Sequence, residues 1–450
     1  MDFPSDFKLC TRRWLGDEYP LLEAALQTEA PVSVRINLAK RIAPPVPSEQ
    51  VKWCRSGYYL PERPSFTADP LFHAGTYYVQ EASSMFLEQA VNQYLTTPVT
   101  CLDLCAAPGG KSTHLLSLLP ADSLLVSNEV IRSRCMILAE NAAKWGAPNV
   151  IVTNNDPKEI GQIAEMFDVI VADLPCSGEG MFRKDPASRK EWSAANVSLC
   201  AARQQRIICD AWPALKPGGL LIYSTCTFNM EENEKNIRFL IETTGATALP
   251  LSIEANWGIA DGRDTTFPAY RFLPHRTKGE GFFLSVLRKP ADGRQCRQAS
   301  AKGKPSALAS LPSPVDGWLN NPDEFCMITD GTVLRAVPVC FADKYLLIHK
   351  QLRIVMAGVT IGERKGCNIA PSVALALSTA FRRKAFPYAA LTRDEALRYL
   401  RRETLVLPEC TSKGYVYVTY NDTPLGFVKN IGSRANNLYP QEWRIKSRLC

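Results

Sequence analysis

The sequence has few histidines, and its cysteines lack the spacing of a metal site or of a disulfide framework. Histidine occurs 4 times in 450 residues, and the 15 cysteines are scattered without any CxxC pair. Structural zinc sites usually take closely spaced pairs of cysteine or histidine, and disulfide-rich domains are short and secreted. We therefore expect no metal and no disulfide framework, with most cysteines acting as small buried hydrophobic residues.

Long apolar runs are also missing. No stretch approaches the roughly 20 apolar residues of a membrane span, and the opening MDFPSDFKLCTRRW has no apolar signal core. These absences predict a soluble, cytoplasmic protein with no membrane partner. No internal repeat is visible either.

Positive charge is concentrated near the C-terminus. Residues 341–450 carry 18 Lys+Arg against 8 Asp+Glu, whereas the other 340 residues are nearly neutral. A basic C-terminal segment beside a nearly neutral body indicates a polyanion-binding module attached to a catalytic one. A basic face that simply meets solvent is the alternative. The length suggests two or three domains, and we expect a monomer.

The stretch TCLDLCAAPGGKSTHLL, residues 100–116, is the centre of the predicted architecture. A short apolar run ends in a turn of small residues and passes into an amphipathic segment, a pattern typical of strand, tight turn and helix. The N-terminus of that helix, beside glycine backbone, is suited to an anionic or carboxylate-bearing ligand. Plain βα turn chemistry remains the alternative for this stretch alone.

Strand-like runs alternate with helical patterns from Val99 to about Lys289, so we predict an α/β fold with a doubly wound, mostly parallel, Rossmann-like sheet. The predicted strands are 99–104, 123–128, 149–153, 168–173, 219–224 and 281–287. A helix is predicted from Tyr77 to about Tyr94, another over 197–215 and a third over 394–403. The predicted domains are an accessory lobe (1–75), the α/β domain (76–289), a linker (290–314), an intermediate domain (315–387) and a C-terminal α+β domain (388–450).

Two acidic residues follow the next two strands of the sheet. Glu129 lies 20 residues after Gly109, where a carboxylate accepts hydrogen bonds from ribose hydroxyls, so the pair indicates a nucleoside site. The turn is neither GxGxxG nor a full phosphate-binding loop, which weakens a dinucleotide or triphosphate interpretation. Asp156 is placed either to contact an adenine amino group or to cap the helix that begins near Pro157.

Thiols follow the last two parallel strands. Asp173-Leu174-Pro175-Cys176 brings a carboxylate and a thiol to one strand end, and Ser224-Thr225-Cys226 brings a second thiol to its neighbour. Ligands of such sheets bind at the carboxyl ends of the strands, so the two thiols are predicted to face one pocket. A chance pair of buried cysteines is the alternative.

These motifs carry a family resemblance. DLCAAPGGK (103–111), ADLPCSGEGMFRKDP (172–186) and LKPGGLLIYSTCTF (215–228) resemble the motifs of the Nop/Sun family of S-adenosylmethionine-dependent RNA cytosine-5 methyltransferases. The resemblance extends over about residues 30–289. The segments PLGFVK (424–429) and NNLYPQEWR (436–444) further resemble the PUA-like RNA-binding end of the family's bacterial member that acts on small-subunit ribosomal RNA.

The resemblance implies a role for each motif. S-adenosylmethionine would be the cofactor, Glu129 would hold its ribose and Asp156 would meet its adenine, while Asp173 would lie between the cofactor and the target cytosine. Cys226 would be the nucleophile that adds to carbon 6 of the base, and Cys176 would help to resolve the product. The turn implied to cradle the methionine part consists of Cys105, Ala106, Ala107, Pro108, Gly109, Gly110 and Lys111.

The resemblance also implies RNA as the partner, most directly 16S rRNA or the small ribosomal subunit, with basic C-terminal residues as an RNA clamp. Four alternatives stay open: transfer RNA as the substrate, Cys176 as the nucleophile, amino-group methylation of adenine, and a non-catalytic RNA-binding assembly factor. The adenine reaction is disfavoured because its motif needs an aromatic residue after Pro-Pro, whereas this chain has Leu174-Pro175-Cys176.

Overall fold

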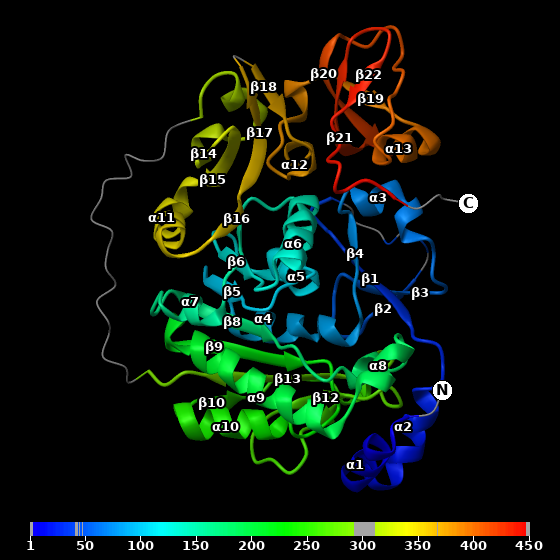
Figure 1. Cartoon of the computed structure of the whole chain (residues 1–450), viewed down its shortest axis with the longest axis vertical. Helices are drawn as coiled ribbons and strands as arrows, with labels where there is room; N and C mark the ends of the chain where they lie inside the picture. The colour runs from blue at the N-terminus through cyan, green and yellow to red at the C-terminus, as the bar shows by residue number, and fades with distance from the viewer. Residues whose placement is uncertain are drawn as a thin grey trace.

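The structure is a computed structural model that describes residues 3–40, 44, 46, 48–291, 311–366 and 368–446. Most of the linker predicted at 290–314 lies outside these residues. A central mixed sheet forms the middle of the molecule, with N-terminal elements along one side and the C-terminal elements at one end (Figure 1). In the described residues, no helix combines the length and the apolar character needed to cross a bilayer.

The central sheet has ten strands in the order β11-β12-β13-β9-β8-β5-β6-β7-β16, with β10 paired to β13. The strands predicted between residues 99 and 287 are confirmed. They are β5 (Thr100–Asp103), β6 (Leu124–Asn128), β7 (Val150–Thr153), β8 (Phe167–Asp173), β9 (Leu215–Thr225) and β13 (Phe282–Arg288). Between β9 and β13 the chain forms the further strands β10 (Thr247–Leu249), β11 (Ala260–Asp261) and β12 (Tyr270–Phe272).

Five neighbouring strands, β7, β6, β5, β8 and β9, run parallel. The chain builds outward from β5 through β6 to β7 and then returns to β8 on the other side of β5. The boundary between β5 and β8 is therefore the switch point of the sheet, beside which ligands of doubly wound folds bind. The glycine turn follows β5 and Asp173 is the last residue of β8, so both lie beside this boundary.

Side chains of the parallel strands alternate between two hydrophobic cores. Cys101 and Val169 belong to one core, whereas their chain neighbours Leu102 and Ile170 belong to the other. This alternation is what a pleated sheet buried on both faces requires. The helices between β4 and β13 are α4 (Leu87–Tyr94), α5 (Gly110–Leu118), α6 (Arg132–Trp145), α7 (Pro157–Gly161), α8 (Pro186–Glu191), α9 (Ala194–Ala211) and α10 (Glu234–Thr244).

The N-terminal lobe is a small antiparallel sheet with flanking helices. Its strands, in the order β2-β3-β1-β4, are β1 (Val32–Ile36), β2 (Glu49–Gln50), β3 (Gly57–Leu60) and β4 (Tyr77–Val79), and its helices are α1 (Ser5–Leu15), α2 (Tyr19–Ala25) and α3 (Pro70–His73). The helix predicted from Tyr77 is wrong in its first part. Tyr77 to Val79 pair with β1, because aromatic and β-branched residues favour a strand, and α4 begins at Leu87.

The region after the linker contributes to the central sheet. Its elements are β14 (Phe325–Asp330), β15 (Val333–Pro338), α11 (Ala342–Gln351), β16 (Ile354–Ala357), β17 (Val359–Lys365), β18 (Asn368–Pro371) and α12 (Val373–Leu377). Strand β16 pairs with β7 at the edge of the central sheet, and Tyr345 and Ile348 of α11 join the core on one of its faces. Strands β14, β15, β17 and β18 form a sheet of their own beside these contacts, and the predicted domain boundaries remain predictions.

The C-terminal part forms a four-stranded sheet with one helix. Its elements are β19 (Tyr388–Ala390), α13 (Arg393–Leu400), β20 (Gly414–Tyr420), β21 (Thr423–Asn430) and β22 (Ala435–Asn437). Helix α13 begins with a capping box between Thr392 and Glu395, which accounts for its start within a residue of the predicted position. This part lies against α3 of the N-terminal lobe (Figure 1).

Candidate active site at the carboxyl edge of the parallel strands

The glycine turn after β5 is held open by contacts to the neighbouring strand and helix. The N–H of Ala106 donates to Asn128 O at 2.8 Å, Arg134 Nη2 donates to Ala107 O at 2.8 Å, and Asn141 Nδ2 donates to Pro108 O at 2.8 Å. Gly109 has φ +114°, a left-handed conformation that favours glycine. Because no side chain caps α5 at this turn, its first N–H groups are left for a ligand.

Two buried carboxylates, those of Asp103 and Glu129, lie close to this turn. Asp103 is fully buried, accepts a hydrogen bond from Ser112 Oγ at 2.6 Å through Oδ2, and has no partner for Oδ1 among the described residues. Burial raises the pKa of Asp103 to about 7. Glu129, also buried, accepts the N–H of Ile131 at 2.9 Å through Oε1, while its Oε2 lies 3.6 Å from Arg134 Nη1.

Asp156 has the capping role that its sequence position allowed. Its side chain accepts the N–H of Lys158 at 3.0 Å, and Glu159 Oε2 accepts the N–H of Asp156 at 2.9 Å, which completes a capping box on α7. The helix-cap interpretation is therefore confirmed, and contact with an adenine ring stays a prediction for this residue.

The two thiols meet. Cys176 follows β8 and Cys226 follows β9, and their sulfur atoms lie 3.1 Å apart with both side chains half-buried. The hydrogen bond to Cys226, together with burial, raises the pKa of Cys176 well above that of a free thiol. Cys176 is thus held as a neutral thiol beside its partner.

A lysine from the glycine turn reaches the same place. Lys111 Nζ lies 2.9 Å from Asp173 Oδ2, and Ser224 Oγ donates to Asp173 Oδ1 at 2.9 Å. Burial disfavours the charge on Lys111, but the attraction of Asp173 outweighs it and raises the pKa of Lys111. Asp173 therefore connects the glycine turn to the thiol pair. The sequence analysis places Lys111 in the cofactor turn but does not predict its ion pair with Asp173.

Two buried glutamates behind the thiols were not predicted from the sequence. Glu179 Oε2 accepts hydrogen bonds from Thr227 Oγ1 and from the N–H groups of Phe228 and Asn229 at 2.7–2.8 Å. Glu232 accepts the N–H of Ser177 at 3.0 Å. These carboxylates fix the loops that follow Cys226 and Cys176, and their place in EGMFRKDP and NMEENEK gives no local signal of it.

Three separate parts of the chain match known protein families. Residues 94–288 match the family described as 16S rRNA methyltransferase RsmB/F, residues 3–82 match the N-terminal domain of 16S rRNA methyltransferase RsmF, and residues 388–445 match the methyltransferase RsmF PUA domain. Ribosomal RNA small subunit methyltransferase F of Cronobacter sakazakii is 31% identical over 450 residues, covering 93% of this chain and 91% of the relative.

The chain belongs to the RsmB/F family of methyltransferases. The Citrobacter koseri ribosomal RNA small subunit methyltransferase F is 33% identical over 415 residues, with 87% of this chain and 84% of that protein covered. A solved methyltransferase homolog from Pyrococcus horikoshii is 26% identical with a TM-score of 0.55 over 64% of this chain and 95% of its own. NSun6 from the same organism shares the fold at 20% identity and a TM-score of 0.55, over 65% of this chain and 99% of its own.

Enzymes of the RsmB/F family use S-adenosylmethionine, and the site has the chemistry to hold it. The cofactor carries a sulfonium and an ammonium cation, and the turn offers the unpartnered Oδ1 of Asp103 beside the buried carboxylate of Glu129. The free N–H groups of α5 are suited to its carboxylate. The predicted cofactor and the predicted α/β fold are therefore confirmed by family membership, while the role of each residue remains a proposal.

The ionisation of Asp103 is expected to make cofactor affinity depend on pH. Since the pKa of this buried carboxyl lies at about 7, its anionic form, which attracts a cation, is lost as pH falls through that value. The Kd for S-adenosylmethionine should rise by up to about tenfold per pH unit below the pKa. Calorimetric titration of wild type and Asp103→Asn at several pH values tests this expectation. The Kd of wild type should rise as pH falls, whereas that of the variant should stay constant. The same pH dependence of Kd in both proteins would contradict it.

Glu179 is expected to act by positioning the loop of Cys226. Glutamine in its place exchanges one carboxylate oxygen for an NH2 group, which cannot accept a hydrogen bond, so either the N–H of Phe228 at Oε2 or the indole N–H of Trp192 at Oε1 loses its acceptor. A misplacement of about 1 Å in the nucleophile's loop is expected to lower kcat by up to about 100-fold. Steady-state kinetics of Glu179→Gln should show this loss of kcat, with the Kd for the cofactor unchanged. The control is Glu242→Gln, on the exposed face of α10. Equal kcat values in the two variants would refute the positioning role of Glu179.

Proposed function

We propose that this enzyme transfers a methyl group to carbon 5 of cytosine in RNA, and that its substrate is 16S rRNA of the small ribosomal subunit. The observation that carries the proposal is the pair of thiols 3.1 Å apart beside the Lys111–Asp173 pair, at the switch point next to the cofactor turn. Methylation of an amino or ring nitrogen needs no thiol, whereas methylation of carbon 5 does, because that carbon is a weak nucleophile.

The residues divide the chemistry between them. Cys226, as thiolate, forms a bond to carbon 6 of the cytosine, and the electron pair of the C5–C6 double bond moves onto carbon 5. Asp173 accepts a hydrogen bond from the amino group at N4 or, when protonated, donates one to N3, and so offsets the charge that builds on the ring. Bound S-adenosylmethionine supplies the electrophilic methyl group. The proton on carbon 5 then passes to water, the electron pair of that C–H bond re-forms the double bond between carbons 5 and 6, and the bond between sulfur and carbon 6 breaks to return the Cys226 thiolate. Cys176 is placed beside Cys226 to assist this release.

Support for an RNA substrate comes from the C-terminal part. Arg383 and Lys384 are exposed and precede Tyr388 in the chain, and Tyr388 is itself 62% exposed, so this part offers both charge and an aromatic surface, which single-stranded RNA binds. The relatives are named for ribosomal RNA of the small subunit, and we extend that target to this chain. In this account the enzyme acts as a monomer in the cytoplasm, where ribosomal RNA is found.

A transfer assay tests the proposal. Full-length enzyme is incubated with labelled S-adenosylmethionine and, in parallel, deproteinised 16S rRNA, assembled small subunits or transfer RNA from cells that lack the gene. Nucleosides are then identified by mass spectrometry. We expect 5-methylcytidine in 16S rRNA, free or assembled. Label in transfer RNA alone would favour the transfer RNA alternative, and cofactor binding without any label would favour an assembly factor.

A further inference from the structure

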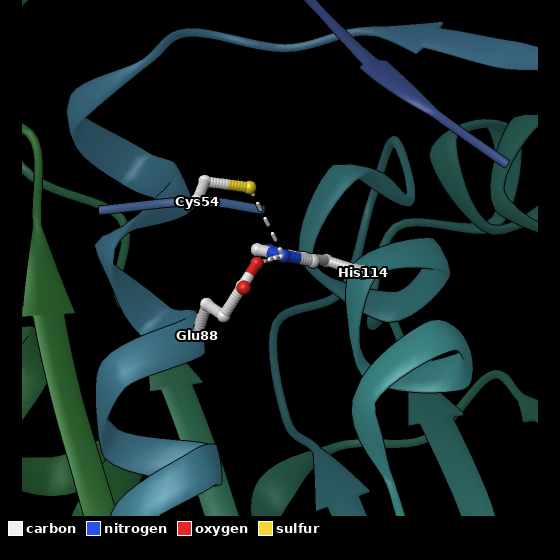
Figure 2. Close-up of side chains that lie close together, drawn as sticks. All are labelled: Cys54, Glu88 and His114. Carbon is white, nitrogen blue, oxygen red and sulfur yellow. Dashed lines mark hydrogen bonds and ion pairs between the residues drawn. The ribbon is translucent and has the colours of Figure 1, made fainter. Parts of the chain in front are cut away.

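Three side chains with metal-binding atoms meet inside the protein, away from the thiol pair. Cys54 comes from the loop between β2 and β3, Glu88 from α4 and His114 from α5, and all three point toward one another (Figure 2). They are buried, with exposed fractions of 2%, 4% and 0%. One ligand atom from each lies within 4.8 Å of those of the other two.

Two of the three separations between these atoms are close to those of tetrahedral zinc. Cys54 Sγ lies 3.7 Å from His114 Nε2, and His114 Nε2 lies 3.1 Å from Glu88 Oε2. Zinc bonds of about 2.3 Å to sulfur and about 2.0 Å to nitrogen or oxygen at tetrahedral angles give separations of about 3.5 Å and about 3.3 Å. We propose that Cys54, Glu88 and His114 form a Zn²⁺ site that ties the N-terminal lobe to α4 and α5.

The protonation states fit such a site. Burial lowers the pKa of His114 to about 4, so its imidazole is neutral, and with its one proton on Nδ1 the Nε2 that faces Cys54 and Glu88 has a lone pair to give. Burial alone would raise the pKa of Glu88, but the hydrogen bond and charge interaction with His114, together with the hydrogen bonds from the N–H of Arg55 and from Cys54, outweigh burial and lower that pKa, so the carboxylate is ionised. Burial raises the pKa of Cys54, so zinc binding displaces its proton to solvent.

Charge both favours and limits binding. One thiolate and one carboxylate neutralise Zn²⁺, which makes the filled site compatible with a buried position. The buried guanidinium of Arg35 also interacts with Cys54 and Glu88, and it opposes a second cation there. For this reason, and because the protein supplies three ligands rather than four, we expect weaker binding than in a four-ligand structural site.

A cavity reaches two of the three residues. It has a volume of about 640 Å³ and is lined by Cys54 and Glu88 together with Arg55 and Trp257. Such a space admits a hydrated ion and leaves room for a water as fourth ligand. The N–H of Arg55 donates to Glu88 Oε1 at 3.0 Å, which orients the carboxylate, as the surroundings of metal ligands usually do.

The alternative is a buried hydrogen-bonded cluster that needs no metal. The contact of Glu88 with His114 satisfies both groups by itself, and Cys54 would then pack beside them as a neutral thiol. The two interpretations differ in the state of sulfur. Only the zinc site requires a thiolate, which can be detected by spectroscopy when Co²⁺ replaces Zn²⁺.

The test uses the full chain, stripped of metal with a chelator and titrated with Co²⁺ and Zn²⁺. Wild type is compared with Cys54→Ser and Glu88→Gln. Cys101→Ser removes another buried thiol as a matched control, and Cys226→Ala removes a thiol of the active site. Circular dichroism verifies folding of each variant. Binding is followed by the thiolate-to-cobalt charge-transfer band and by the thermal unfolding temperature with and without zinc.

We expect one Co²⁺ per chain with a thiolate band, displacement of Co²⁺ by Zn²⁺ and stabilisation by zinc, all retained in Cys101→Ser and Cys226→Ala. Cys54→Ser should lose the band, and both cluster variants should bind at least about 100-fold more weakly, since even groups that only orient a ligand change affinity by 10- to 100-fold. Absence of a thiolate band in wild type would overturn the proposal. So would a band that survives in Cys54→Ser, or one that disappears in Cys226→Ala.

Discussion

Replacing Cys226 by alanine is expected to lower kcat/KM by at least about 10⁴-fold. Carbon 5 of cytosine becomes nucleophilic enough to attack the methyl group only after a thiolate has added to carbon 6. The Kd for S-adenosylmethionine should stay the same, since the glycine turn is held by contacts from β6 and α6 rather than by the thiol. Methyl transfer to 16S rRNA and cofactor calorimetry measure the two quantities separately.

Cys176→Ala gives the matched comparison. It removes the neighbouring thiol, 3.1 Å away, but leaves the nucleophile, so covalent adducts with 5-fluorocytosine RNA should still form. With ordinary RNA, release should be slow and the adduct should accumulate, visible as a band of lowered mobility in denaturing gels. Loss of the adduct in Cys176→Ala with its persistence in Cys226→Ala would reverse the two roles and make Cys176 the nucleophile.

Breaking the Lys111–Asp173 pair is expected to have the second-largest effect. Asp173→Asn removes the carboxylate that lies 2.9 Å from Lys111 Nζ. In the proposed reaction this carboxylate also hydrogen-bonds the cytosine. A group that stabilises charge or moves a proton in the transition state usually contributes about 10²- to 10⁴-fold, so kcat should fall within that range. Lys111→Met should also lower kcat, because the carboxylate is then no longer fixed by a buried cation.

Ser224→Ala is the control for this pair. It deletes the hydrogen bond to the other oxygen of Asp173 and leaves both charges in place, so a reduction of less than about tenfold is expected. Single-turnover rates on RNA with saturating cofactor separate this step from binding. Equal rates for wild type and Asp173→Asn would exclude a role of the carboxylate in the reaction.

The sequence was sufficient to predict the parts of the fold that depend on local pattern. Each parallel strand is a short apolar run that ends at a turn, and the alternation of these runs with helices restricts the topology to a doubly wound sheet. The glycine turn and the motifs of the two thiols could be placed for the same reason, since the carboxyl ends of parallel strands share one edge. Family resemblance added the cofactor, which the matches to known proteins confirm.

What the sequence could not predict depends on contacts between distant segments. Strand β16 is a short apolar run like any other, and nothing local shows that it pairs with β7, about 200 residues earlier in the chain. Glu179 and Glu232 look like surface acids until the fold buries them behind the thiols.

Cys54, Glu88 and His114 come from three separate elements, so the spacing rules that led us to expect no metal had no pair of ligands to detect. The contact of Lys111 with Asp173 was missed for the same reason. Each residue belongs to a different motif, and only the packing of β5 beside β8 brings the two motifs together.

Bisulfite sequencing of ribosomal and transfer RNA tests the central claim most directly. RNA is taken from cells without the gene and from the same cells complemented with wild type, Cys226→Ala or Cys101→Ser. The account predicts that one or a few cytosines of 16S rRNA lose protection without the gene, and that wild type and Cys101→Ser restore it while Cys226→Ala does not. Unchanged protection of every cytosine in both kinds of RNA would contradict it.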